Sequence, residues 1–518
     1  MANEDERPPS ANTEFAPMSG APLWIAGGLL ALSNFVTVLD TTITNVSVPN
    51  IAGGLAVSPN QGTWVITSYA VAEAIMVPLS GWLAQRFGAV KLFVAGIIGF
   101  GICSALCGFA TSLSALVVFR IMQGICGGPL MPLSQSLLRR IFPAAKQAHA
   151  LGLWSMTTTV APIAGPLLGG MLVDNAGWPW IFFINVPIAL VVGVLIWRYL
   201  GTRETATERK PVDFIGLALL IVWVGALQIM LDKGKDLDWF GSGFIVSLAA
   251  IAALGFSAFL IWELTDEHPI VDLRVFRHRG FAASAAVMTL AYGSFFSAVV
   301  LLPLWLQINL GYTATWAGRA FAFQGVFAVI LSPIVARMTQ SYDSRILVTI
   351  GMLTFAAVGV WRSSFNTDIA FYQVVMPQLA QGAAIPFFFI PLMAVALGSV
   401  PPREVTSAAG LLTFMRSTSA AFATSITITQ WEDIAVDRRV DIAGTLNRAG
   451  GALDALSQAG NSAAQALRQL DSLVQTQAVM LATNRVFFIV SFVFMAAAAA
   501  VWLAPRVKRP PASAGGGH

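Results

Sequence analysis

The stretch 35-FVTVLDTTITNVSVP-49 places an acid, Asp40, inside a run of bulky apolar residues. Such a run is typical of a membrane-spanning helix, and a carboxylate at membrane depth is costly, so it usually faces a protein interior or a water-filled passage. Thr41, Thr42, Thr44 and Asn45 follow Asp40, and this polar string favours a hydrated face over a lipid-facing one. We therefore expect Asp40 to have a function, and Asn45 is a candidate lining residue of a passage.

The composition indicates that lipid surrounds most of the chain. Of the 518 residues, 56% are hydrophobic and 11% are charged, whereas a soluble domain carries about 25% charged residues. The net charge of +4 is small and the basic residues lie between apolar runs, so nothing suggests a nucleic-acid partner. The three cysteines (Cys103, Cys107 and Cys126) fall inside apolar runs, which favours packing over metal binding or disulfides. The acidic N-terminus does not resemble a cleaved signal peptide.

Apolar segments of sufficient length predict an all-α integral membrane protein with fourteen transmembrane helices. Lysine and arginine concentrate in alternate loops, which places both termini in the cytoplasm by the positive-inside rule. The short loops expected on the outer side hold only Lys233, Lys235 and Arg362. The predicted spans are 22–48, 62–84, 91–110, 114–137, 148–173, 178–199, 214–231, 242–263, 281–306, 316–336, 346–362, 371–398, 405–430 and 485–504.

Two buried-charge motifs suggest how such a protein uses a proton. Arg120 lies in 116-LVVFRIMQGICGGPLMP-132, and because a buried arginine costs about 2.5–3.5 kcal/mol, we expect it to face the interior and find a partner. Gln123, three residues later, lies on the same helix face and could share a polar lining. The alternative is that Arg120, near the outer end of its span, reaches the lipid headgroups. Glu73 lies midway through 64-WVITSYAVAEAIMVPLSGW-82 and is, with Asp40, one of two acids well inside the first-half spans.

Our hypothesis is that Asp40 and Glu73 carry protons and that Arg120 biases their protonation, because an acid can exchange a neighbouring arginine for a proton. The alternative for each acid is that it only pins a helix by hydrogen bonding. In the second half, Arg416 lies among the hydroxyls of 414-FMRSTSAAFATSITITQ-430 and could line a passage. The run 386-PFFFIPLM-393 could form an apolar wall for a substrate or could face lipid.

Glycines and prolines mark two further motifs. In 81-GWLAQRFGAVKLF-93, Gly81 permits close helix approach, Gly88 permits a tight turn, and Arg86 and Lys91 hold the loop at the inner face.

In 161-APIAGPLLGG-170, Gly165 and Gly169 form a small-xxx-small face, followed by Gly170. Pro162 and Pro166 interrupt the hydrogen-bond ladder of the same segment, so it can bend against a neighbouring helix.

Together these motifs resemble the major facilitator superfamily, and within it the fourteen-span drug/proton antiporters of the EmrB/QacA type, most closely the EmrB-like members. The similarity continues through 178-WPWIFFINVP-187, 227-LQIMLDKGKDLDWF-240, 262-WELTDEHPIVDL-273 and 311-GYTATWAG-318, and covers nearly the whole chain. In this family the Gly-Pro run of the fifth span is regarded as an antiporter signature. One departure is Gln85, where many facilitators carry an aspartate, so a gate built on an acid–base pair at that position is in doubt.

The resemblance implies a major facilitator fold of two six-helix bundles related by a pseudo-twofold axis, with two extra spans between them. It implies proton-driven export of hydrophobic or amphipathic small molecules from a bacterial inner membrane, without a cofactor, and pairing with a periplasmic membrane-fusion adaptor and an outer-membrane channel. A narrow-specificity metabolite transporter of the same fold is the alternative. An enzyme is not expected, because the histidines (His149, His268, His278 and His518) are scattered and no catalytic cluster is visible.

The same resemblance gives a division of the chain. The expected parts are a cytoplasmic tail (1–20), an N-terminal bundle (21–200), a linker with the two extra spans (201–279), a C-terminal bundle (280–505) and a second cytoplasmic tail (506–518). Within the C-terminal bundle we expect a periplasmic loop at 431–484. Its segment 462-SAAQALRQLDSLVQTQAVMLAT-483 predicts an amphipathic helix that packs on the protein's outer face, lies on the membrane or meets a partner.

Overall fold

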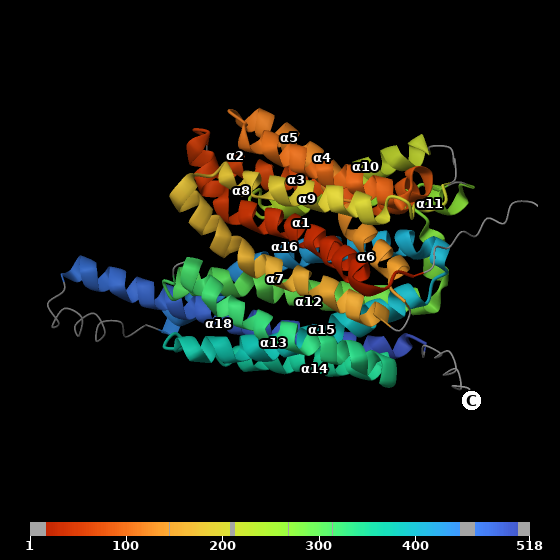
Figure 1. Ribbon diagram of the computed structural model, residues 1–518. Helices are drawn as coiled ribbons and strands as arrows, with labels where there is room; N and C mark the ends of the chain where they lie inside the picture. Colours follow the sequence, from red (N-terminus) through yellow and green to blue (C-terminus); the bar gives the residue numbers. More distant parts are fainter. Residues whose placement is uncertain are drawn as a thin grey trace, which may run out of the picture.

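The helices run side by side in one elongated bundle (Figure 1). The computed structural model describes residues 17–57, 59–143, 146–207, 213–267, 269–312, 314–445 and 462–505. The first half contains α1 (Gly20–Gly54), α2 (Pro59–Gly62), α3 (Trp64–Phe87), α4 (Ala89–Gly108), α5 (Leu113–Gly127), α6 (Leu130–Ile141), α7 (Gln147–Ala176), α8 (Trp180–Phe183) and α9 (Asn185–Leu200). The rest contains α10 (Phe214–Lys233), α11 (Gly243–Thr265), α12 (Arg279–Asn309), α13 (Ala314–Ser341), α14 (Ser344–Arg362), α15 (Phe371–Gly398), α16 (Val405–Thr445) and α18 (Ala463–Ala500).

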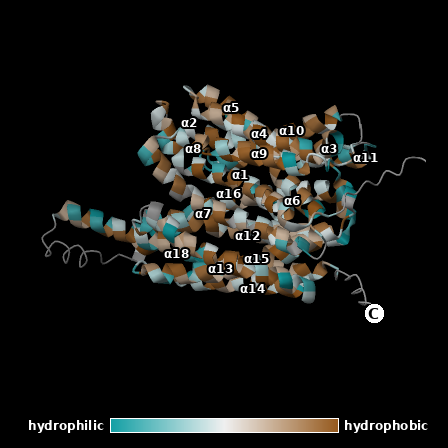
Figure 2. Ribbon diagram, viewed as in Figure 1, coloured by the Kyte–Doolittle hydropathy of each residue, from teal (hydrophilic) through white to brown (hydrophobic). Residues whose placement is uncertain are grey.

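Helices occupy every predicted span, and apolar residues cover much of their surface (Figure 2). Within the described residues, 12 helical segments are long and apolar enough to cross a membrane. The chain is therefore a multi-pass membrane protein. Helices α7 and α16 are not among the twelve, although they coincide with the predicted spans 148–173 and 405–430. The count of fourteen spans accordingly stays a prediction.

The two halves meet along two pairs of helices. Helix α7 packs against α1 of its own half and against α13 of the other, and α3 packs against both α5 and α16. The extra helices α10 and α11 pack on each other, and α10 also touches α3 and α16. Figure 1 shows α1–α9 on one side of the bundle and α12–α15 on the other. The interface between the halves is therefore built mainly from α3, α7, α13 and α16, with smaller contacts of α6 on α16 and of α15 on α7.

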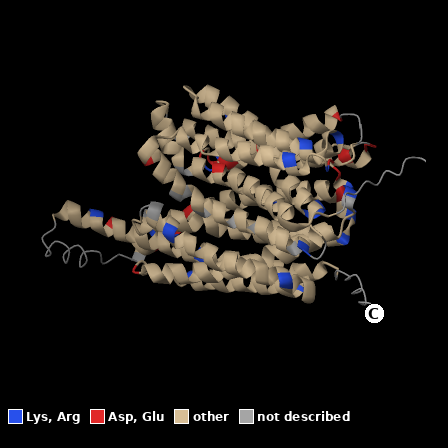
Figure 3. Cartoon of the chain, viewed as in Figure 1, with Lys and Arg blue, Asp and Glu red and all other residues tan. Residues whose placement is uncertain are grey.

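The two ends of the bundle differ. At one end α16 and α18 extend beyond the other helices (Figure 1); we call this the hairpin end, and the opposite end, where α1 begins and α3 finishes, the basic end. Many of the Lys and Arg residues in Figure 3 lie toward the basic end.

Most of the described part of the segment 431–484, predicted as a periplasmic loop, is helical. Helix α16 continues to Thr445 and α18 already begins at Ala463, because a helix needs no apolar residues once it leaves lipid and nothing breaks it there. Ser462 and Gln465 form a capping box at the start of α18, with the Ser462 N–H donating to Gln465 Oε1 at 2.9 Å. The helix predicted over 462–483 is confirmed as the first part of α18. It packs on α16, and residues 446–461 lie outside the described residues.

Two smaller differences concern the ends of spans. The predicted span 114–137 is two helices, α5 and α6, separated at Gly128-Pro129, and it extends to Ile141. Arg362, expected in an outer loop, is the last residue of α14 and only 2% exposed. Its Nη2 donates to Gln378 Oε1 at 2.7 Å and to Gln381 Oε1 of α15, which provides a polar environment inside the bundle.

Candidate functional site

A buried ion pair joins α1 and α5 in the first half. Arg120 Nη1 lies 2.6 Å from Asp40 Oδ2, and the two side chains are 1% and 0% exposed. Gln123 completes a triangle, since its Oε1 accepts from Arg120 Nη1 at 2.8 Å and its Nε2 donates to Asp40 Oδ1 at 3.1 Å. Arg120 therefore faces the interior with a carboxylate partner, as expected, and the alternative that it reaches the lipid headgroups is wrong.

The guanidinium of Arg120 also contacts α3. Its Nε donates to the backbone carbonyl of Val65 at 3.1 Å, in the first turn of that helix. Its Cζ lies 4.2 Å from the centre of the Tyr69 ring, a distance at which a cation is attracted by the aromatic face. The ion pair thus holds α3 as well as α1 and α5.

Asn185 is a site residue that the sequence did not single out. Its Nδ2 donates to Asp40 Oδ1 at 2.7 Å and lies 3.2 Å from Ser104 Oγ, so α9 and α4 join the same cluster. Asn185 was visible as a lone amide in 178-WPWIFFINVP-187, and a buried polar side chain in an apolar run signals a partner. Asp40 consequently receives donors from Arg120, Gln123 and Asn185.

Glu73 lies on α3 in a different environment. It is half-buried, and no hydrogen bond or ion pair joins its carboxylate to another described residue. Arg120, Asp40 and Arg416 are close enough to influence it electrostatically. The alternative that Glu73 only pins a helix by hydrogen bonding therefore finds no support in its contacts, whereas Asp40 has such contacts.

The polar residues that follow Asp40 differ in their surroundings. The hydroxyl of Thr44 donates to the backbone carbonyl of Asp40 at 2.7 Å, and that of Thr42 donates to Val38 O at 3.0 Å, so both are satisfied within α1. Asn45 is exposed and lies outside the Asp40 cluster. The structure brings Gln123 to the buried acid but not Asn45.

The glycines of α7 lie against α1. A methyl group added to Gly165 would overlap Thr42, including its backbone carbon, and one added to Gly169 would touch Ile43 at 3.5 Å. Gly170 has open space around it. The contact between α7 and α1 thus depends on Gly165 above all, while the side chain of Pro166 lies outside the described residues.

The loop around 81–93 is held by contacts from both halves of the chain. A methyl group at Gly81 would overlap Ser407 of α16, so α3 and α16 approach closely at the basic end. Gly88 has a φ of +92°, a conformation that favours glycine, and closes the turn between α3 and α4. Arg86 lies 5.4 Å from the Trp82 ring centre.

The acid at this loop comes from a distant segment. Glu204 accepts from the backbone N–H groups of Val90 at 3.0 Å and Lys91 at 2.8 Å, at the start of α4, while the Lys91 side chain is exposed. A carboxylate is stabilised at a helix N-terminus by the unpaired N–H groups and the helix dipole. Glu204 therefore supplies a negative charge at the loop, although position 85 carries glutamine.

An aromatic pocket lies between the halves near the middle of the bundle. It is lined by α7, α12, α13 and α15, and its lining includes Pro162 from the first half and Tyr292, Phe295, Phe296 and Phe389 from the second. Tyr292 and Phe389 meet edge to face at 5.7 Å between ring centres. In the run 386–393, all residues except the half-buried Phe387 are buried, so this segment faces the protein interior and not lipid.

Arg416 lies beside this pocket. It is 4% exposed, and its Cζ lies 5.2 Å from the Tyr292 ring centre and 5.4 Å from that of Trp154. Its Nη2 contacts the sulfur of Met131, and no ion pair with a carboxylate is formed among the described residues. The structure thus places Arg416 at the interface, beside the aromatic pocket and within electrostatic range of Glu73.

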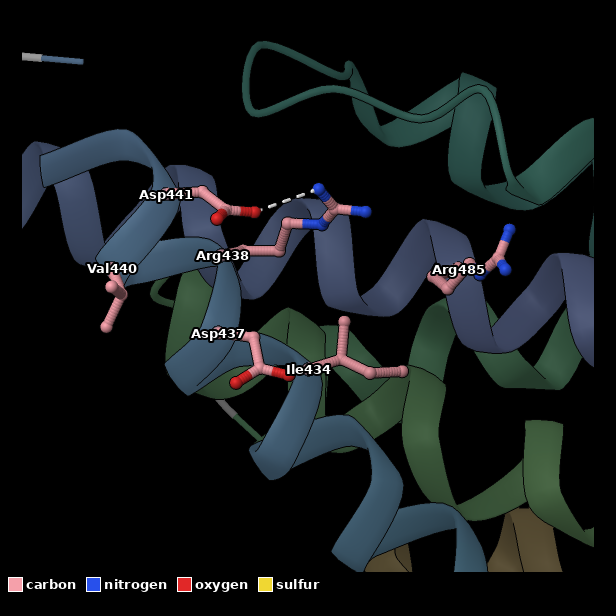
Figure 4. A pocket seen from close by; sticks show the side chains of 6 residues that line it. All are labelled: Ile434, Asp437, Arg438, Val440, Asp441 and Arg485. Atoms are coloured by element: carbon pink, nitrogen blue, oxygen red, sulfur yellow. Dashed lines mark hydrogen bonds and ion pairs between the residues drawn. The ribbon is translucent and has the colours of Figure 1, made fainter. Parts of the chain in front are cut away.

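A second, open pocket lies at the hairpin end. Figure 4 shows Ile434, Asp437, Arg438, Val440 and Asp441 of α16 and Arg485 of α18 around it, with Arg438 Nη1 3.2 Å from Asp441 Oδ2. Across the hairpin, Arg439 Nη2 lies 2.7 Å from Asp471 Oδ1. Among the described residues no group of three His, Cys, Asp or Glu side chains could hold a metal ion.

The sequence profile of the Major Facilitator Superfamily matches residues 30–424. The chain is 44% identical over 510 residues to the fatty acid resistance protein FarB of Neisseria gonorrhoeae, covering 98% of this chain and 100% of that protein. It is 44% identical over 506 residues to the multidrug export protein EmrB of Escherichia coli (strain K12), covering 97% and 98% of the two. The solved structure of the proton:xylose symporter XylE matches with a TM-score of 0.57 at 13% identity, covering 93% of this chain and 96% of that one, a likeness of fold alone.

Proposed function

The chain belongs to the major facilitator superfamily, and from that premise we propose that it is a proton-coupled exporter of hydrophobic and amphipathic compounds. The names of its relatives, a multidrug export protein and a fatty acid resistance protein, support export of such molecules. The single observation that carries proton coupling is the buried Asp40–Arg120 pair. Transport would proceed by alternating access, with the halves rocking about the interface between them.

Protonation of Asp40 is the step that would couple the gradient to motion. It removes the negative charge beside Arg120 and leaves a buried guanidinium without a counter-ion, which is strongly unfavourable. Arg120 Nη1 keeps Gln123, and Nε keeps the carbonyl of Val65 in α3. The balance between two positions of α3 relative to α1 and α5 would therefore depend on whether Asp40 carries a proton.

The aromatic pocket is the proposed substrate site. Facilitators with parallel repeats place their sites near the bilayer midplane between the repeats, and this pocket takes its walls from both halves. Aromatic faces offer apolar contact without strict shape demands, which suits a broad range of compounds. Arg416 and Glu73 lie beside the pocket, so one could attract anionic compounds and the other cationic compounds.

The orientation follows from charge. By the positive-inside rule the basic end would face the cytoplasm of a bacterium, and the hairpin end would face the periplasm. Both termini would then be cytoplasmic, and the protein would reside in the inner membrane.

The hairpin end is the proposed docking site for a periplasmic membrane-fusion adaptor, which would connect the exporter to an outer-membrane channel. Val436 and Val440 on α16 are 63% and 67% exposed, and Leu467 and Leu473 on α18 are exposed as well, on helices that leave the bundle. Exposed apolar residues outside the lipid zone usually mark an interaction surface.

The proposal is tested in proteoliposomes that contain the purified protein and a lipophilic fluorescent dye. An imposed proton gradient should drive dye movement, and dye addition should release protons, whereas protein-free vesicles should show neither. Dye movement at the same rate with and without the gradient would contradict proton coupling. A panel of chemically unrelated dyes separates a multidrug exporter from the narrow-specificity alternative, which would accept one of them or none.

A further inference from the structure

The turn between the extra helices α10 and α11 touches both halves at the hairpin end. On the first-half side, Thr67 Oγ1 of α3 donates to Asp232 Oδ2 at 2.5 Å, and Lys233 Nζ donates to Thr63 Oγ1 at 2.5 Å. Lys233 also lies 5.6 Å from the ring centre of Trp64. The end of α10 is therefore fastened to the first turn of α3.

The same turn is fastened to α16 of the second half. Lys235 Nζ lies 2.5 Å from Glu432 Oε1, and Trp239 Nε1 donates to Thr429 Oγ1 at 3.0 Å. Ser425 Oγ donates to the backbone carbonyl of Leu231 at 2.8 Å. The two extra helices thus bridge the halves at the end through which an exported compound leaves.

The bridge lies next to the proton-sensitive pair. Thr63 and Thr67, which bond to α10, stand on either side of Val65, whose carbonyl accepts from Arg120. A shift of the first turn of α3 when Asp40 takes a proton would therefore move the end of α10 with it.

The two sides of the bridge differ in strength. On the α3 side Lys233 is buried, and α10 packs more extensively on α3 than on α16. On the α16 side the side chains of Lys235 and Glu432 are 39% and 49% exposed, and the hydrogen bond from Ser425 to Leu231 is the buried contact. Exposed ion pairs contribute little because water and salt compete for the charges, whereas breaking buried polar contacts leaves groups unsatisfied. The smaller packing of α10 on α16 and this exposed ion pair make the α16 side the weaker of the two.

We propose that α10 and α11 act as a latch: they stay with α3 and hold α16 through Lys235 and Trp239, which are positioning residues for transport. Release of substrate at the hairpin end then requires the Lys235–Glu432, Trp239–Thr429 and Ser425–Leu231 contacts to break. The Thr67–Asp232 contact persists. The inference rests on the proposed alternating-access function. It gives α10 and α11 a role of their own, separate from that of the paired bundles.

Cross-linking tests the direction of opening. In a background with Cys103, Cys107 and Cys126 replaced by serine, one variant carries Lys235→Cys and Glu432→Cys, and a matched variant carries Thr67→Cys and Asp232→Cys. A short bis-methanethiosulfonate reagent should lower dye export at least tenfold in the first variant, reversibly with dithiothreitol, and change it less than twofold in the second. Export that survives the first cross-link, or is lost with the second, overturns the proposal.

The untreated variants separate this test from that of the proposed function. If the serine background and both untreated variants do not move dye in response to a proton gradient, the result contradicts the proposed proton-coupled export and does not bear on the latch. The latch is then judged by spin-label distances between Gly53→Cys of α1 and Asp433→Cys of α16, which need no transport. Lys235→Glu should increase the population at long distance, and the swap Lys235→Glu with Glu432→Lys should restore the parent distribution. An unchanged distribution in Lys235→Glu, or a swap that behaves like the single variant, overturns the latch.

Discussion

Arg120 Nη1 and Asp40 Oδ2 lie 2.6 Å apart, with both side chains almost completely excluded from solvent. Gln123 and Asn185 donate to the other carboxylate oxygen, and Arg120 reaches Val65 O in α3. One carboxylate therefore connects α1, α5 and α9, and through its arginine α3. A single proton at this carboxylate would alter the contacts of four helices at once.

The second half carries a related cluster without an acid. The run 378-QLAQG-382 of α15 parallels 120-RIMQG-124 of α5, with Gln378 in place of Arg120 and Arg362 of α14 supplying the guanidinium. Gly124 packs on the backbone of Tyr69, and Gly382 packs on that of Gln324 in the corresponding way. Since glutamine does not titrate, this cluster cannot respond to protons as the Asp40 cluster can. The contrast favours proton traffic through the first half.

The first prediction concerns the charge of Asp40. Asp40→Asn keeps the shape but leaves Arg120 buried without a counter-ion, so it should abolish drug-induced proton movement and lower stability by about 3–5 kcal/mol. Dye binding at the aromatic pocket, which Asp40 does not line, should change little. Proton movement in proteoliposomes, thermal unfolding in detergent and equilibrium dye binding measure the three effects.

A double variant separates a loss of proton transport from a loss of stability. Asp40→Asn with Arg120→Gln removes both charges, so stability should recover while proton movement stays absent, because an uncharged pair replaces a broken ion pair. Normal proton movement in the single or the double variant would refute a proton-carrying role for Asp40.

The second prediction concerns Glu73. Since no hydrogen bond holds its carboxylate among the described residues, Glu73→Gln should change stability by no more than about 0.5 kcal/mol. Proton-driven export should nevertheless be lost if Glu73 carries a proton, and dye binding should persist. Export at the normal rate would leave Asp40 as the one remaining proton carrier of our hypothesis, and normal export in both single variants would refute the hypothesis for both acids.

The sequence alone predicted where the helices lie and which three residues, Asp40, Arg120 and Gln123, would belong to the buried site. Each predicted span coincides with a helix because long apolar runs fold as helices in lipid. Asp40, Arg120 and Gln123 stood out because polar groups there are costly. The sequence predicted only one of their contacts. Helix spacing placed Gln123 on the same face as Arg120. The distance from Asp40 to Arg120 could not be predicted, because it depends on how α1 and α5 pack.

The features that the sequence did not predict depend mostly on contacts between different helices. Asn185 was passed over because one amide in an apolar run does not reveal its partner. Arg362 was assigned to a loop because it ends a span, although its partners Gln378 and Gln381 lie on another helix. Helix α16 was ended near 430 because hydropathy falls there, whereas helical geometry continues to Thr445.

The third prediction concerns the aromatic pocket. Tyr292→Leu removes an aromatic wall that also contacts Phe389, so dye affinity should fall by about 0.5–1.5 kcal/mol, or roughly 2- to 10-fold. Phe488→Leu is the matched control, because Phe488 lies on the exposed surface of α18 away from the pocket. Fluorescence titration of both variants measures the effect. Equal affinity losses in the two would place the dye site elsewhere.

The fourth prediction concerns the contact between α7 and α1. Gly165→Ala adds a methyl group where Thr42 leaves no room, so α7 must move away from α1 at a cost of about 1–3 kcal/mol. Gly170→Ala, five residues later in the same helix, adds it to open space and should be neutral or stabilise the helix by up to about 1 kcal/mol. Thermal unfolding and dye export of the two variants measure the difference. The contact requires glycine only if Gly165→Ala loses both stability and export while Gly170→Ala keeps them, and equal behaviour of the two would show that α7 tolerates displacement from α1.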